Sequence, residues 1–164
     1  MKARRVAFMS LSIALAMILS FVESQIPALV AIPGIKVGLP NIVMVFLLYR
    51  AGWQETVTVS LIRIFLVALL FGNVQTLTFS IAGALVSLSL MILLKKTDRF
   101  SCIAVSITGG IGHNLGQILA ACLWTATSQV AWYLPVLLVS GTVSGGLIGL
   151  LAGIMVKRMK NWKY

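Results

Sequence analysis

The chain has 164 residues, of which 60% are hydrophobic and only 10% are charged. A soluble domain of this length could not bury so much apolar surface, because a substantial part of any small fold stays in contact with water. The composition therefore excludes an ordinary soluble fold and predicts one integral membrane domain over residues 1–164.

Basic residues dominate the charged minority, with 13 Lys and Arg against 3 acids and a net charge of +10 at pH 7. In a soluble protein such an excess would favour nucleic-acid binding. Here the basic residues lie mainly in the short gaps between apolar runs, a pattern that orients membrane proteins and contacts anionic headgroups. We therefore expect membrane lipids as partners and no nucleic acid.

Six apolar runs predict an all-α, polytopic membrane bundle with about six transmembrane helices. In chain order the spans are roughly 6–23, 38–50, 56–71, 76–94, 100–124 and 135–156. The second and third are shorter than the roughly 20 residues that a helix perpendicular to the bilayer needs. The runs lack the alternation of a β-barrel. The first run lacks a convincing cleavage site, so we read it as a retained helix. Residues 23–37, with Pro27, Pro33 and Gly34, are predicted to be a loop.

Alternating these spans across the membrane puts most basic side chains on one side. They are Lys2, Arg4, Arg5, Arg50, Lys95, Lys96, Arg99 and the C-terminal cluster. Lys36 falls in a loop on the opposite side. This asymmetry predicts that both termini are cytoplasmic.

The fifth span contains a polar segment, residues 106–117 (SITGGIGHNLGQ), which includes the chain's single histidine, His113. On a helix, Ser106, Gly110, His113 and Gln117 share one face. Polar groups at membrane depth are unfavourable unless they face protein, water or a ligand. We predict that His113, Asn114 and Gln117 bind a ligand, and the alternative is that they only form interhelical hydrogen bonds.

Arg63 interrupts the third span. Burying an unpaired arginine there would cost at least about 2.5–3.5 kcal/mol, and no acid is expected within a span to neutralise it. We predict that Arg63 binds an anionic group, with a structural tie or a reach to the headgroups as the alternatives. Four further polar residues share the outer side and complete the predicted binding set, although loop solvation would explain each alone. They are Lys36, Asn41, Asn73 and Gln75.

Small residues predict where helices pack closely. Two sets of glycines lie in the last two spans: Gly109, Gly112 and Gly116, and the every-fourth series Gly141, Gly145, Gly149 and Gly153. In the first span, Ser10/Ala14 and Ser12/Ala16/Ser20 give small faces. These faces serve either a partner or packing within the bundle.

No catalytic residue, metal site or cofactor is predicted. The spans hold no pair of acids, the chain has no Asp-rich cluster for Mg²⁺-diphosphate, and one histidine cannot ligate a haem from both sides. Cys102 and Cys122 lie near opposite ends of one predicted helix and cannot pair with each other.

Several segments resemble the Gx transporter family, whose members often carry the label heptaprenyl diphosphate synthase component I. They are residues 34–41 (GIKVGLPN), Arg63, Gly72-Asn73 with residues 76–83, and residues 109–117 (GGIGHNLGQ). The family is similar to the substrate-binding S components of energy-coupling factor transporters. This resemblance implies a six-helix bundle in the bacterial plasma membrane and a site formed by outer loops and later helices. It also implies a transmembrane coupling protein with a pair of ATPases as partners.

The resemblance leaves two functional hypotheses. In the first, the chain is a substrate-binding or transport subunit for a small metabolite, anionic, isoprenoid, or related to a quinone or flavin. In the second, it is a non-transporting subunit of an extracellular electron-transfer assembly, with an electron-transfer partner and a lipid-facing groove between helices. We do not expect a prenyl-transfer enzyme, because the only aspartate is Asp98, in a basic loop.

Overall fold

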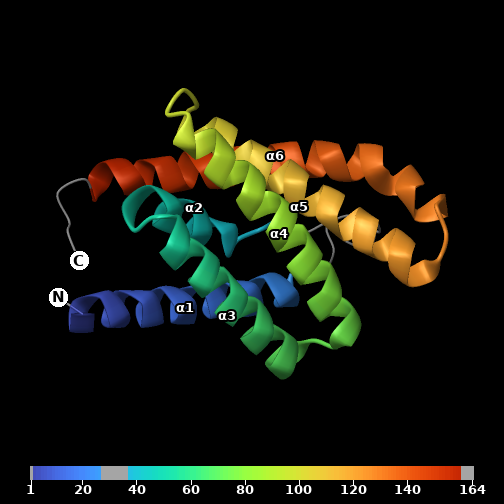
Figure 1. The fold of residues 1–164 in the computed structure, drawn as a ribbon, viewed down its shortest axis with the longest axis horizontal. Helices are drawn as coiled ribbons and strands as arrows, with labels where there is room; N and C mark the ends of the chain where they lie inside the picture. Colours follow the sequence, from blue (N-terminus) through green and yellow to red (C-terminus); the bar gives the residue numbers. More distant parts are fainter. Residues whose placement is uncertain (1, 27–36, 160–164) are drawn as a thin grey trace.

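The computed structural model describes residues 2–26 and 37–159, so Lys36 and the last basic residues lie outside the described part of the chain. Within these ranges the regular structure is entirely helical, which confirms the all-α prediction (Figure 1). The elements are α1 (Lys2–Gln25), α2 (Asn41–Arg50), α3 (Trp53–Phe71), α4 (Val74–Lys96), α5 (Cys102–Thr125), the short 3-10 helix η1 (Gln129–Tyr133) and α6 (Leu134–Arg158).

Four of these helical segments are long and apolar enough to cross a membrane: α1, α3, α4, and η1 together with α6. The predicted second span is a helix of only 10 residues, α2. The predicted fifth span, α5, has 24 residues, but His113, Asn114 and Gln117 lower its hydropathy. The helix number predicted from the sequence is therefore confirmed, while length and composition support four spanning helices.

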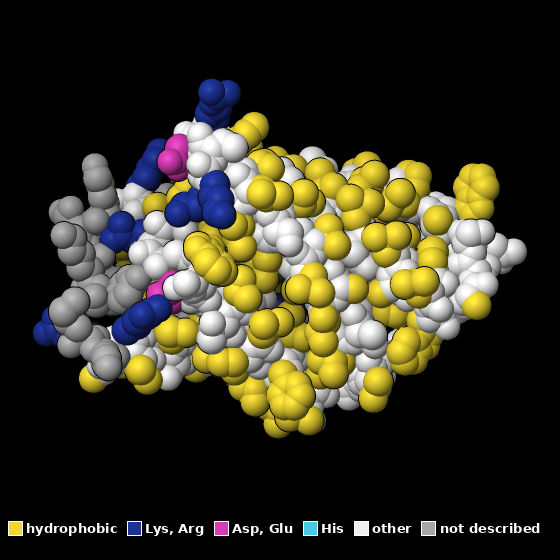
Figure 2. Space-filling view, in the orientation of Figure 1, with side chains coloured by type: hydrophobic (Ala, Val, Ile, Leu, Met, Phe, Trp, Pro, Cys, Tyr) yellow, Lys and Arg dark blue, Asp and Glu magenta, His cyan; other side chains and the backbone are white. Residues whose placement is uncertain are grey.

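The surface separates into an apolar body and a basic end. Hydrophobic side chains cover most of the visible body, and Lys and Arg side chains gather at one end (Figure 2). At that end Arg5 forms an ion pair with Glu55. Arg50 donates a hydrogen bond of 2.7 Å to the carbonyl of Met159. A body of exposed apolar side chains with most of the charged side chains at one end is typical of a membrane protein.

One helix end differs from the sequence prediction. The loop expected from Glu23 onwards begins later, because α1 continues through Glu23 to Gln25. No proline or glycine interrupts residues 18–25, so nothing in this stretch stops the helix. Glu23 therefore belongs to a helix, in the half of the bundle away from the basic end.

The start of α4 is fixed by a reciprocal cap. The Asn73 side chain accepts a hydrogen bond from the Thr76 backbone N–H, and the Thr76 hydroxyl accepts one from the Asn73 N–H, both at 2.8 Å. This arrangement satisfies two of the backbone donors that a helix leaves free at its N-terminus. It makes the turn between α3 and α4 short and sets the position of Thr76.

Helix α5 lies between α4 and α6 and packs closely against both. On the α6 side, a β-carbon at Gly145 would lie 2.8 Å from Ile107 Cα, and one at Gly149 would lie 2.7 Å from Ile103 Cα. On the α4 side, a β-carbon at Gly116 would lie 2.8 Å from Gly83 Cα. Glycine thus lets the three backbones approach as a tightly packed layer.

The other half of the bundle is held by ordinary side-chain packing. Helix α2 is buried along most of its length, and Leu47 and Leu48 are fully inaccessible. Ser12 and Ala16 of α1 are also buried. The face of α1 formed by Ser12, Ala16 and Ser20 therefore packs within the bundle, whereas Ser10 and Ala14 are exposed.

Candidate functional site

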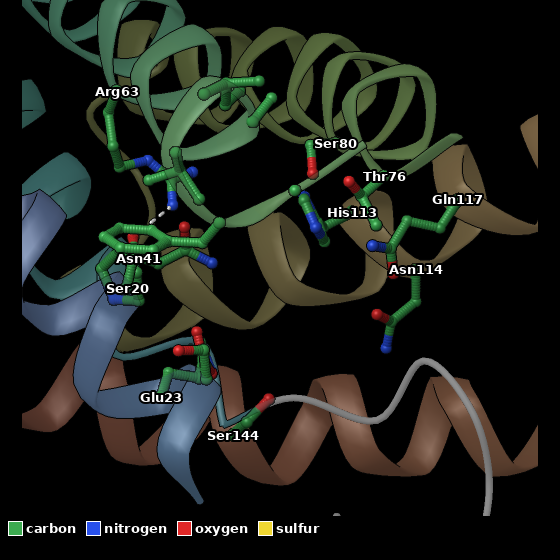
Figure 3. Close-up of a pocket in the computed structure, with 18 of the residues that line it drawn as sticks. Ser20, Glu23, Asn41, Arg63, Thr76, Ser80, His113, Asn114, Gln117 and Ser144 are labelled. Carbon is green, nitrogen blue, oxygen red and sulfur yellow. Dashed lines mark hydrogen bonds between the residues drawn. The ribbon is translucent and has the colours of Figure 1, made fainter. Parts of the chain in front are cut away.

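A pocket of about 190 Å³ lies between the two halves of the bundle (Figure 3). Its wall combines apolar side chains with many hydroxyl, amide and charged groups. The lining residues are Ser20, Glu23, Ser24, Gly38, Pro40, Asn41, Arg63, Ile64, Val67, Ala68, Phe71, Gly72, Thr76, Ser80, Gly110, His113, Asn114, Gln117 and Ser144. Apart from the two residues before α2, Gly38 and Pro40, and the turn residue Gly72, all lie on the α-helices, so the fold itself positions the polar groups.

Arg63 projects into this pocket from the middle of α3. Its Nη1 donates a hydrogen bond of 3.1 Å to Ser20 Oγ of α1 (Figure 3). Its Nε is buried and has no hydrogen-bond partner among the described residues. A guanidinium carries five donors. The guanidinium of this lining residue therefore has more donors than its hydrogen bond to Ser20 uses.

Glu23 is the second charged residue of the lining. Its Oε1 accepts a short hydrogen bond from the backbone N–H of Gly38, which joins the end of α1 to the segment that precedes α2. This corrects the expectation that no acid lies near Arg63 within the bundle. The sequence pattern missed Glu23 because proline and glycine a few residues later predicted a loop.

His113 faces the pocket from α5 and packs against α4. A β-carbon at Gly83 would lie 2.8 Å from both Cε1 and Nδ1 of the imidazole. Ser80 and Thr76, one and two turns earlier on α4, line the same part of the pocket. The glycine at residue 83 thus gives His113 the room to lie beside these hydroxyl groups.

Asn114 and Gln117 differ in their surroundings. The Asn114 side-chain amide donates a hydrogen bond of 2.5 Å to the Leu137 carbonyl in the first turn of α6, and Asn114 is buried. Gln117 lines the pocket and forms no hydrogen bond to another described residue. Asn114 therefore ties α5 to α6, while the Gln117 amide remains available to a bound molecule.

Five of the eight residues predicted to bind a ligand line the pocket: Arg63, His113, Asn114, Gln117 and Asn41. Asn73 and Gln75 do not, since Asn73 caps α4 and both side chains are exposed. Lys36 lies outside the described residues.

Sequence reasoning missed several lining residues. Besides Glu23, they include Ser20, Ser24, Thr76, Ser80 and Ser144. A signal existed for two of them, because Thr76, Ser80, Gly83 and Ser87 fall on one helical face. Single serines at helix interfaces gave no comparable signal.

The donor set suits binding better than metal chemistry. No group of three or more His, Cys, Asp or Glu side chains that could hold a metal ion is found in the described ranges 2–26 and 37–159. The pocket offers one guanidinium, one carboxylate, one imidazole, three amides and several hydroxyls. Such groups fix the orientation of a small polar molecule in an otherwise apolar surrounding.

Comparison with known proteins gives one match. Residues 12–155 match the family model described as heptaprenyl diphosphate synthase component I. No curated protein and no solved structure matches the chain.

Proposed function

Because the chain belongs to the heptaprenyl diphosphate synthase component I family, a name that implies a partner component, we propose that it is the membrane subunit of a larger assembly. In this proposal the subunit binds a small metabolite in the pocket between its two halves. The carrying observation is that Arg63, partly buried in the middle of an apolar helix, lines a pocket with a polar wall and has a guanidinium N–H that no described residue accepts.

The position of the pocket supports capture from outside the cell. The basic residues lie at the end formed by the start of α1, the α2–α3 turn and the α4–α5 connection (Figure 1, Figure 2). By the positive-inside rule this end faces the cytoplasm of the cell, with both termini. The part of the bundle away from this basic end contains several of the lining residues: Ser20, Glu23, Thr76 and Gln117. In this orientation the pocket faces outward.

A transport role requires energy from elsewhere, because the sequence holds no phosphate-binding loop. A membrane coupling protein with a pair of ATPases would supply it, as the resemblance to S components implies. The bacterial plasma membrane is the location that fits such an assembly.

We propose binding rather than prenyl transfer. Prenyl transfer needs clustered carboxylates that hold Mg²⁺ on a diphosphate. The chain has 3 acidic residues, and of these only Glu23 lines the pocket, whereas Glu55 pairs with Arg5 and Asp98 lies in the α4–α5 connection.

The alternative role, a subunit of a quinone- or flavin-linked electron-transfer assembly, predicts a lipid-facing groove between helices in place of an outward cavity. The pocket instead gathers charged, amide and hydroxyl groups from six helices, α1 to α6. This lining favours the binding subunit.

Native mass spectrometry of the full chain, extracted under mild conditions, tests the proposal. We expect a retained small molecule with the wild-type chain, loss of that molecule in Arg63→Met, and retention in Arg99→Met, which removes an exposed arginine outside the pocket. Equal retention by Arg63→Met and wild type, or no bound molecule in any sample, contradicts the assignment. The same spectra would show any subunit that remains attached.

A further inference from the structure

Two opposite charges face the same pocket without closing an ion pair. Arg63 and Glu23 both line it, yet no nitrogen–oxygen contact between them is short enough for a salt bridge. In a region of low dielectric, opposite charges attract strongly. Their separation therefore needs a structural cause.

The structure supplies a tether for each group (Figure 3). Arg63 is held by Ser20 Oγ at 3.1 Å. The Glu23 carboxylate is held through Oε1 by the Gly38 backbone N–H, and its Oε2 forms no hydrogen bond to another described residue. Each charged group thus has an atom that hydrogen-bonds to no described residue: Nε of Arg63 and Oε2 of Glu23.

From this arrangement, and resting on the binding role proposed above, we propose that the pocket selects a small zwitterion. An acidic group of the molecule contacts the Arg63 guanidinium, and a protonated amine or similar donor contacts Glu23 Oε2. Both fixed charges are then compensated in the bound state, which removes the penalty of leaving partly buried charges unpaired.

Side chains on the opposite wall of the pocket hydrogen-bond to the rest of the bound molecule. His113, Gln117 and Ser80 present an imidazole, an amide and a hydroxyl, which suit neutral hydrogen-bonding groups. A cavity of roughly 150 Å³ accommodates benzene, so the volume of about 190 Å³ fits a short-chain or single-ring compound. A long prenyl chain exceeds it.

The same lining disfavours a diphosphate. The charged lining groups are one guanidinium and one carboxylate. A diphosphate would place several negative charges beside the Glu23 carboxylate, and a single arginine would oppose them. Removal of the Glu23 charge should therefore shift the preference of the pocket towards anions.

The first test offers the full chain in detergent a deproteinated metabolite extract of the cells that express it, and identifies retained compounds by mass spectrometry. Four variants accompany the wild type: Arg63→Met, Glu23→Gln, and the matched controls Arg99→Met and Asp98→Asn, which change exposed charges outside the pocket. Gln at residue 23 keeps the oxygen that accepts the Gly38 N–H.

We expect the compound enriched by wild type to carry both an acidic and a basic group. Its enrichment should fall at least about tenfold in both pocket variants, as loss of a charged hydrogen bond predicts, and stay unchanged in both controls. An enriched compound that is only anionic, or whose enrichment is unaffected by Glu23→Gln, overturns the zwitterion proposal and leaves the binding role intact. No enriched compound at all overturns both.

The second test uses inorganic diphosphate and measures the unfolding temperature in detergent. We expect no shift for the wild type and an upward shift for Glu23→Gln that disappears in the double variant with Arg63→Met. Stabilisation of the wild type that depends on Arg63 would overturn the proposal. An absent shift in Glu23→Gln would show that the carboxylate does not exclude anions, which also counts against it.

Discussion

Gly83 of α4 and His113 of α5 are in such close contact that a β-carbon at residue 83 would lie 2.8 Å from two atoms of the imidazole. The same β-carbon would lie 3.0 Å from the His113 carbonyl oxygen, so the backbone is also close. The place of the imidazole in the pocket thus depends on the absence of a side chain on the neighbouring helix.

Gly83→Ala should displace His113 and weaken binding. The added methyl group forces either the ring or the helix backbone to move, and overpacking of this kind costs about 1–3 kcal/mol. The gain in helix propensity from glycine to alanine, about 1 kcal/mol, does not offset the upper part of that range. Retention of the small molecule and the unfolding temperature in detergent should both fall.

Gly146→Ala provides the control for this substitution. A β-carbon there would meet its nearest atoms, on the Ile107 side chain, only at 4.0 Å. The variant should keep its bound molecule and be as stable as wild type or slightly more stable. If Gly83→Ala behaves like Gly146→Ala, the contact does not position His113.

Gly145→Ala should separate α5 from α6. The new β-carbon would lie 2.8 Å from Ile107 Cα and 2.9 Å from the Ser106 carbonyl oxygen, both backbone atoms that cannot rotate away. We expect a loss of about 1–3 kcal/mol in stability, measured by unfolding in detergent.

Gly153→Ala serves as the comparison within the same glycine series. Its β-carbon would meet the nearest atom, Cys102 Cβ, at 3.8 Å, an ordinary contact distance. Stability should stay within the small gain expected from helix propensity. Equal destabilisation by the two substitutions would be inconsistent with close packing confined to part of the series.

Asn114 and Gln117 should respond differently to alanine. Asn114→Ala removes the hydrogen bond to the Leu137 carbonyl, and such interhelical bonds contribute roughly 0.6 kcal/mol on average. Its main effect should be a lower unfolding temperature. Gln117→Ala should leave the unfolding temperature unchanged and reduce retention of the bound molecule, because its amide lines the pocket and forms no hydrogen bond to another described residue.

Native mass spectrometry and thermal unfolding on the same two samples separate these effects. A stable Asn114→Ala variant that no longer binds would move Asn114 from the helix contact into direct binding. A destabilised Gln117→Ala variant that still binds would show that Gln117 supports the fold and does not contact the bound molecule.

The proposed orientation can be measured by cysteine labelling in intact cells. In a background with Cys102→Ser and Cys122→Ser, we introduce Asp98→Cys in the α4–α5 connection or Ser128→Cys before η1. A maleimide that does not cross membranes should label residue 128 from outside and residue 98 only after permeabilisation. Labelling of residue 98 in intact cells would reverse the orientation and place the pocket on the cytoplasmic side.

The helices were largely predictable because hydropathy and turn residues act locally. Apolar runs bounded by Gly52, Gly72-Asn73 and residues 95–99 correspond to α3 and α4 within a few residues. The burial of α2 was not predictable in the same way. An apolar segment has a similar composition whether it faces lipid or protein. The sequence therefore does not show that this helix lies in the core, and only the fold does.

The site was predictable in part, and for the same reason. Arg63 and the polar face of α5 stood out because polar groups are rare in apolar helices. Glu23 and Asn73 did not follow from the pattern. Which neighbour a polar side chain contacts depends on packing. Glu23, which the pattern placed in a loop, therefore lines the pocket, and Asn73, which was predicted to bind a ligand, caps α4.

The glycine contacts on both faces of α5 also have a mechanical consequence. Backbones in direct contact cannot slide or part without losing many contacts at once, so α4, α5 and α6 should move as one rigid plate. The seam towards α1, α2 and α3 is built from longer side chains, which can change rotamer. We expect the motion that opens the pocket to a molecule to separate α1, α2 and α3 from α4, α5 and α6. The capped turn at Asn73, which joins α3 to α4, would act as the hinge.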